Sequence, residues 1–114
     1  MITKVEKPWG FEEVIESNDQ YLFKRLFMKK GHRCSLQYHE NKKETVFVLE
    51  GKLNIYHGKS GNNLKLKEMS PGESITLEPK LIHRMEGSTD CFYLESSSPH
   101  IDDVVRIEDD YERK

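Results

Sequence analysis

The chain has 114 residues, which is the size of a single domain. At this length folding hides roughly two-thirds of the unfolded surface, enough for a hydrophobic core without disulfides. Eighteen Lys and Arg against twenty Asp and Glu give a formal net charge of −2, so the basic excess of a nucleic-acid-binding protein is absent. No run approaches the roughly 20 apolar residues that a membrane span needs, which argues against a membrane partner.

We expect one domain over residues 1–114, with its core at about 20–97, preceded by an N-terminal strand and followed by a C-terminal tail. The first ten residues lack the apolar centre of a signal peptide, so we expect a cytoplasmic protein. In that compartment Cys34 and Cys91 are expected to be two reduced thiols that fill space.

Short apolar runs alternate with turn residues at intervals near ten along most of the chain. These runs are rich in Val, Ile, Phe, Tyr and Thr, which favour strands. Strands are therefore predicted over Phe11–Glu16, Tyr21–Met28, Arg33–His39, Glu44–Glu50, Lys52–His57, Leu64–Met69, Ser74–Leu77, Leu81–Met85 and Cys91–Glu95. Only Ile101–Lys114 is expected to hold a helical turn or two. Many short strands at this spacing indicate an all-β sandwich or small barrel.

A group of polar side chains on neighbouring predicted strands suits a metal ion. Ser35, Gln37 and His39 share one face of an extended strand. A hairpin beyond the polar turn after His39 brings Glu44 opposite that histidine, and His83 lies in another short strand. Two imidazoles, a carboxylate and a carboxamide oxygen facing one interior would bind a divalent first-row metal.

The spacing around these residues resembles that of the cupins. The first motif is matched by Gly31-x5-Gln37-x-His39-x4-Glu44-x6-Gly51, with Gln37 in place of the usual first His. Gly72-x10-His83 matches the second motif, with Lys80 where that motif has its second Gly.

Three further segments resemble successive landmarks of the type II mannose-6-phosphate isomerases. They are KPWGFEEV (Lys7–Val14), KRLFMKKGHRCSLQYH (Lys24–His39) and DDVVRIEDDYER (Asp102–Arg113). The resemblance implies a cupin jelly-roll β-sandwich, a phosphorylated hexose as small-molecule substrate, and a homodimer. It also implies one divalent metal ion, with zinc, manganese, iron, cobalt and nickel all open, and the ligands Gln37, His39, Glu44 and His83.

Catalytic and substrate-binding candidates follow from residue type and position. Lys42 occupies the position of an arginine in the family, and it is a candidate base together with His32 and Glu40. Arg106 is the first candidate for the substrate phosphate, and Lys24, Arg25 and Ser35 are further candidates for substrate binding. Trp9 is expected to plug the sandwich.

Three functions remain open. The first is the interconversion of mannose 6-phosphate and fructose 6-phosphate by proton transfer through an enediol. The second is a non-catalytic cupin that binds a sugar or sugar phosphate, because the family's residues are replaced by Glu40, Asn41, Lys42, Thr45 and Val46. The third is an iron-dependent dioxygenase, since two His and a carboxylate can hold iron.

Overall fold

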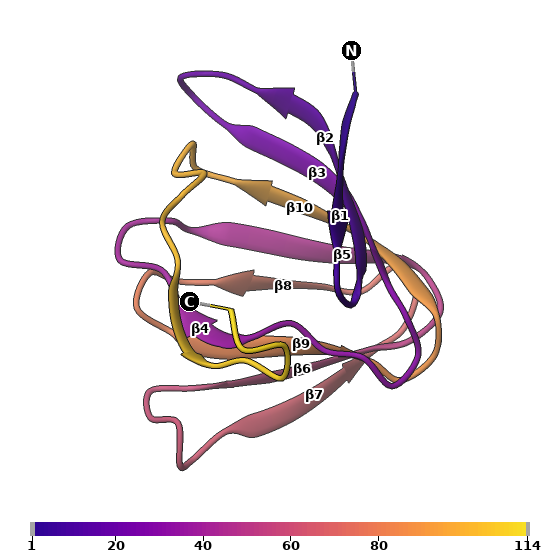
Figure 1. Cartoon of the computed structure of the whole chain (residues 1–114), viewed down its shortest axis with the longest axis vertical. Helices are drawn as coiled ribbons and strands as arrows, with labels where there is room; N and C mark the ends of the chain where they lie inside the picture. Colours follow the sequence, from indigo (N-terminus) through magenta and orange to yellow (C-terminus); the bar gives the residue numbers. More distant parts are fainter. Residues whose placement is uncertain (1, 114) are drawn as a thin grey trace.

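The structure, a computed structural model, describes residues 2–113 and consists of strands arranged in two antiparallel sheets (Figure 1). No helix occurs within those residues, so the expected all-β fold is confirmed. A segment long and apolar enough to cross a membrane as a helix is accordingly absent from the described part of the chain.

The larger sheet has six strands in the order β1-β2-β3-β10-β5-β8. Its bounds are β1 Thr3–Lys7, β2 Gly10–Ser17, β3 Leu22–Met28, β10 Cys91–Ser97, β5 Glu44–Glu50 and β8 Ser74–Leu77. The strand β10 comes late in the chain yet lies between β3 and β5, with Tyr93 paired to both Leu26 and Val48.

The smaller sheet has five strands in the order β11-β4-β9-β6-β7. Its bounds are β11 Val105–Glu108, β4 Leu36–Tyr38, β9 Ile82–Gly87, β6 Leu53–Gly58 and β7 Lys65–Met69. The two sheets lie face to face, and the segment after β10 runs from the larger sheet to the smaller one before pairing as β11 (Figure 1).

Alternation along each strand decides which side chains face the space between the sheets. In β3 the side chains of Leu22, Lys24, Leu26 and Met28 are buried, while those between them are only half-buried. The core is completed by apolar residues of both sheets, with Trp9 among them as expected. The thiols of Cys34 and Cys91 are free and buried, as expected for space-filling cysteines.

Two tight turns require a left-handed backbone. Gly51 has φ +77°, and a Cβ there would lie 2.1 Å from the carbonyl oxygen of Asp90, so only glycine fits. Lys80 has φ 70° although it carries a side chain. It stands where the second cupin motif has a glycine, so the turn keeps its shape in spite of the substitution.

The C-terminal part of the chain differs from the sequence prediction. The helical turns expected in Ile101–Lys114 are absent from the described residues, and β11 occupies Val105–Glu108 instead. A tertiary contact explains the difference: β11 pairs with β4, and this pairing places Arg106 beside Gln37. Lys114, the last residue of that predicted range, lies outside the described part of the chain.

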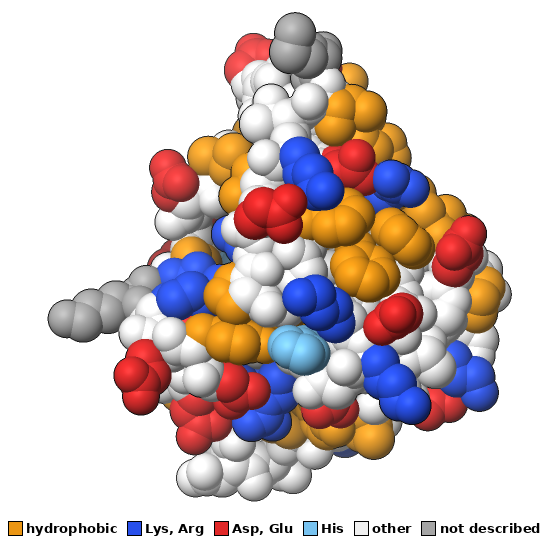
Figure 2. Space-filling view, turned by 45° about the vertical axis from the view of Figure 1, so that its right-hand side comes forward, with side chains coloured by type: hydrophobic (Ala, Val, Ile, Leu, Met, Phe, Trp, Pro, Cys, Tyr) orange, Lys and Arg blue, Asp and Glu red, His pale blue; other side chains and the backbone are white. Residues whose placement is uncertain are grey.

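Outward-facing side chains of the larger sheet form an aromatic cluster. The rings of Phe11 and Phe27 stack with centroids 5.4 Å apart, and those of Phe27 and Phe92 lie 4.9 Å apart. Lys4 and Arg25 lie over this cluster in cation–π contacts. Figure 2 shows hydrophobic side chains gathered on one face of the molecule with basic and acidic side chains around them.

Truncation of the core should cost more stability than the same truncation at the surface. Leu53 is 0% exposed, so Leu53→Ala should lower the free energy of unfolding by about 2–5 kcal/mol. Leu66 is 56% exposed, and Leu66→Ala should change it by less than about 0.5 kcal/mol. Urea unfolding followed by fluorescence measures both, and equal losses would contradict the described core.

Candidate metal centre

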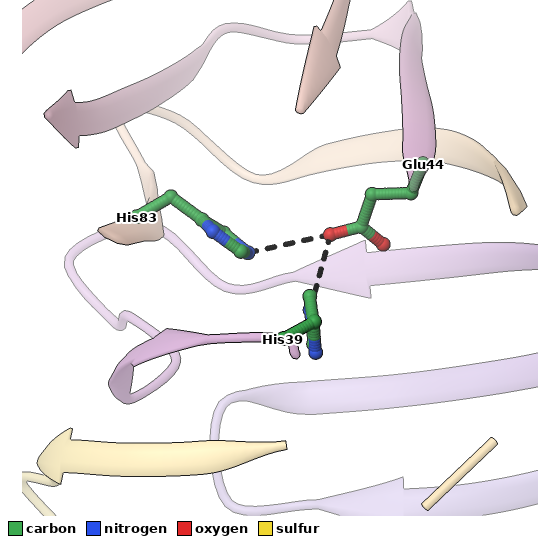
Figure 3. A group of neighbouring side chains, drawn as sticks. All are labelled: His39, Glu44 and His83. Atoms are coloured by element: carbon green, nitrogen blue, oxygen red, sulfur yellow. Dashed lines mark ion pairs between the residues drawn. The ribbon is translucent and has the colours of Figure 1, made fainter. Parts of the chain in front are cut away.

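Three side chains from distant parts of the chain meet between the sheets (Figure 3). His39 follows β4, Glu44 begins β5 and His83 lies in β9. The Oε1 atom of Glu44 lies 3.4 Å from Nε2 of His39 and 3.3 Å from Nε2 of His83. The three side chains are 5%, 3% and 1% exposed. The predicted convergence of these three residues is therefore present.

The other nitrogen of each imidazole is held by a backbone carbonyl. Nδ1 of His83 donates to the carbonyl oxygen of Leu81 at 2.9 Å, and Nδ1 of His39 donates to that of Asp103. Because a carbonyl only accepts, the proton of each neutral ring sits on Nδ1. The lone pair of each Nε2 is therefore directed toward Glu44, which is the arrangement that metal-ligating histidines have.

The Glu44 carboxyl is ionised. Burial raises its pKa, but the neighbouring His39 and His83 outweigh burial and hold the pKa well below its usual range. The buried Nε2 of His83 has no hydrogen-bond partner. A carboxylate oxygen and the Nε2 atoms of two imidazoles thus converge on one point, and a divalent cation bound there would satisfy all three. The residues present fit such an ion.

Gln37 lies next to this group. It pairs with His83 across β4 and β9 and lines the same cavity. Its Oε1 accepts a hydrogen bond of 2.6 Å from Oγ of Ser35, which leaves a second lone pair on that oxygen. Gln37 as fourth metal ligand stays a prediction. Ser35 is fully buried and hydrogen-bonds Gln37, and it does not line the cavity expected to receive substrate.

The site opens into a cavity of about 260 Å³ between the sheets. Its walls include Gln37, His39, Lys42 and Glu44, with Arg106 contributed by β11. Lys42 is only 5% exposed, and its ammonium makes no hydrogen bond or ion pair with any residue between 2 and 113. An ammonium group without a directly contacting protein partner is suited to an anionic ligand in the cavity.

The two basic candidates of β3 have different positions. Lys24 lines the cavity, with its Nζ 3.0 Å from Oε1 of Glu12. Burial lowers the pKa of Lys24, but Glu95 and Glu12 outweigh it and raise the pKa. Arg25 faces outward, where it pairs with Glu13 at 2.6 Å and covers the ring of Phe92. Arg25 is therefore not placed to bind a substrate in this cavity, contrary to the sequence expectation.

Two of the candidate bases lie away from the cavity walls. His32 stacks on Tyr111 with ring centroids 6.5 Å apart, and the side chain of Glu40 is exposed. Lys42 is the one of the three that lines the cavity.

Glu95 is a residue of the site that was not predicted from the sequence. This residue lies on β10 and lines the cavity together with Glu44. Burial and the adjacent charge of Glu44 raise the pKa of Glu95 well above its usual range. Its position could have been found from alternation, because Cys91, Tyr93 and Ser97 of the same strand are buried and Glu95 shares their face.

A two-sheet jelly roll with two histidines and a glutamate inside is the architecture of the cupins. Solved structures of similar fold support this class. CapF from Staphylococcus aureus matches 95% of this chain and 34% of its own with a TM-score of 0.80 at 18% identity. KdgF from Halomonas sp. matches 88% of both chains with a TM-score of 0.74 at 15% identity. An oxalate decarboxylase from Lactobacillus farciminis matches 93% of this chain and 33% of its own, with a TM-score of 0.78 at 14% identity.

Residues 1–109 match the family described as mannose-6-phosphate isomerase C-terminal, and the chain belongs to it. The mannose-1-phosphate guanylyltransferase RfbM of Salmonella typhimurium is 30% identical over 110 residues, which are 92% of this chain and 22% of that protein. The xanthan biosynthesis protein XanB of Xanthomonas campestris is 28% identical over 96% of this chain and 24% of its own length. The chain thus spans less than a quarter of the curated relatives it matches.

Loss of any one of the three converging side chains should strongly weaken metal binding. His83→Ala and Glu44→Gln each remove one of the three converging atoms, so Zn²⁺ affinity should fall at least about 100-fold. Glu50→Gln is the control, because Glu50 lies on the same strand as Glu44 and its side chain is exposed. Calorimetric titration of the metal-free protein measures the affinities, and wild-type affinity in Glu44→Gln would contradict this site.

Proposed function

We propose that the protein is a metal-dependent sugar-phosphate isomerase that interconverts mannose 6-phosphate and fructose 6-phosphate. The observation that carries the proposal is one cavity whose walls include Lys42 together with His39 and Glu44, two members of the His39, Glu44 and His83 cluster. The match of residues 1–109 to a mannose-6-phosphate isomerase family favours this substrate over other phosphosugars.

The reaction moves a proton between two adjacent carbons of the open-chain sugar. A base removes the proton from C2 while the carbonyl oxygen at C1 takes up a proton, which gives the enediol. Reprotonation at C1 together with loss of the hydroxyl proton from the oxygen on C2 then leaves the ketone at C2. The barrier lies in the negative charge that develops on oxygen. A divalent cation held by His39, Glu44 and His83 would supply Lewis-acid stabilisation of that charge.

The remaining roles belong to side chains of the cavity. Lys42 is the candidate for proton transfer, because its amine lines the cavity without a protein partner. Arg106 is the candidate for the phosphate, since a guanidinium offers two parallel donors to an anionic group. The paired Lys24 and Glu12 form part of the wall beside them.

The departures from the family's pattern fall mostly outside the cavity walls. Glu40 and Asn41 have exposed side chains, and Thr45 shares a hydrogen bond with Thr76. Val46 is fully buried in the core. Of the five departures only Lys42 lines the cavity, and it keeps the positive charge of the residue it replaces. This distribution favours catalysis over a binding-only module.

The protein loaded with Zn²⁺ or Mn²⁺ should convert mannose 6-phosphate to fructose 6-phosphate, measured by coupling the product to a dehydrogenase. Lys42→Ala should lower kcat/KM about 10²–10⁴-fold, as loss of a proton-transfer group does. Lys43→Ala is the matched control, because the neighbouring Lys43 is exposed and pairs with Glu78, and it should leave kcat/KM within about twofold.

Binding of the sugar phosphate without turnover would contradict the isomerase and identify a binding module instead. Turnover that requires molecular oxygen would point to the dioxygenase.

We also propose that the protein is a homodimer, as the resemblance to the isomerases implies. Light scattering coupled to gel filtration should then give twice the mass of one chain, and a mass equal to one chain at micromolar concentration would contradict the dimer.

A further inference from the structure

The C-terminal segment (residues 98–106) carries a carboxylate that organises the loop after the first metal ligand. Asp103 lies in this segment, between β10 and β11. Its Oδ1 accepts a hydrogen bond of 3.0 Å from the backbone N–H of Glu40. Its Oδ2 accepts hydrogen bonds of 2.7 Å and 2.9 Å from those of Asn41 and Lys42. One side chain thus satisfies three consecutive backbone donors.

The backbone of the same residue holds a metal ligand. The carbonyl oxygen of Asp103 accepts the Nδ1–H of His39. Because this contact leaves the Nε2 lone pair of His39 facing Glu44, it sets the tautomer that a metal needs. Asp103 therefore reaches the ligand through its carbonyl and the loop bearing Lys42 through its carboxylate.

A second contact of the C-terminal segment completes the arrangement. The backbone N–H of Lys43 donates to Oγ of Ser98 at 3.1 Å, and the N–H of Ser98 returns a bond of 3.0 Å to the carbonyl of Lys43. All four N–H groups of residues 40–43 are thus bound by side chains of the C-terminal segment. The conformation of residues 40–43 is therefore held by contacts with the C-terminal segment.

Further residues of the C-terminal segment line the cavity itself. Ile101, Asp102, Val104 and Arg106 form part of its wall. The segment passes from the larger sheet to the smaller one alongside the ends of the strands (Figure 1). Any displacement of Asp103 would therefore alter the ligand, the loop and the wall together.

We propose that Asp103 is a positioning residue of the metal centre, which holds His39 in its ligating tautomer and fixes the loop that presents Lys42. This inference rests on the metal site of the proposed function, and it does not depend on which sugar is the substrate. Through Asp103, a segment more than sixty residues beyond His39 in the sequence becomes part of the site.

Titration with Co²⁺ alone, followed by its d–d absorption, tests this role. Asp103→Ala keeps the backbone carbonyl but removes the carboxylate that ties residue 103 to the loop of residues 40–42. That carbonyl is then no longer held in place against His39, so the Kd for Co²⁺ should rise by about 10–100-fold. Asp103→Asn keeps the size and one acceptor oxygen, so its increase should be smaller. Wild-type affinity, within twofold, in both variants would overturn the proposal.

A matched control separates positioning from general loss of stability. Asp110 also ties the C-terminal part to the body of the protein, with bonds of 2.6 Å and 2.9 Å to Arg33. Asp110→Ala should lower the urea midpoint yet leave the Co²⁺ affinity within twofold. If Asp110→Ala weakened Co²⁺ binding as much as Asp103→Ala, the specific role of Asp103 would be refuted.

The wild-type protein offers a test that needs no folded variant. The ¹⁵N chemical shifts of the metal-free His39 ring should identify the Nδ1–H tautomer as the form present. An Nε2–H tautomer in the wild type would overturn the proposal. Failure of the wild type to bind Co²⁺ with the tautomer in place would instead refute the metal site, so the two failures are distinct.

Discussion

A carboxylate buried between two sheets is stable only where polar or positive groups face it, and the arrangement around Glu44 meets this condition. Glu44 belongs to the larger sheet and His83 to the smaller one, so the group spans both layers. Both the polar cluster and the hydrophobic core constrain the register of β5, because Glu44, Val46 and Val48 share its inner face. A shift by one residue would turn the carboxylate and two core valines to the outside together.

Much of this arrangement could be predicted from the sequence because it depends on local rules. Alternation placed the strand positions, and the short polar turn after His39 was enough to bring Glu44 opposite it. The spacing from Gly72 to His83 survived the replacement of a motif glycine by Lys80, which adopts the left-handed conformation in its stead. The fold class and the meeting of His39 with Glu44 follow from such patterns, and the motif spacing added His83.

The features that could not be predicted depend on contacts between distant segments. Lys24 and Arg25 are adjacent and chemically alike, yet a strand sends neighbours to opposite faces, so only Lys24 reaches the cavity. The tail became an edge strand because β4 offered it a partner. The part played by Glu95 needed knowledge of which strand lies beside β5. Composition and motif spacing carry none of this information.

The order of the strands in space has a consequence for how the molecule assembles. The strand β10 separates β3 from β5, and β11 completes the smaller sheet only after it. Since the bond between Asp103 and His39 closes a loop of 64 residues, the cluster of His39, Glu44 and His83 reaches its final arrangement only once the C-terminal segment has docked. Topologies dominated by such non-local pairing fold slowly, in milliseconds to seconds. The nascent chain therefore carries its histidines for some time before they reach their native positions, and completion of the cluster should be among the last events of folding.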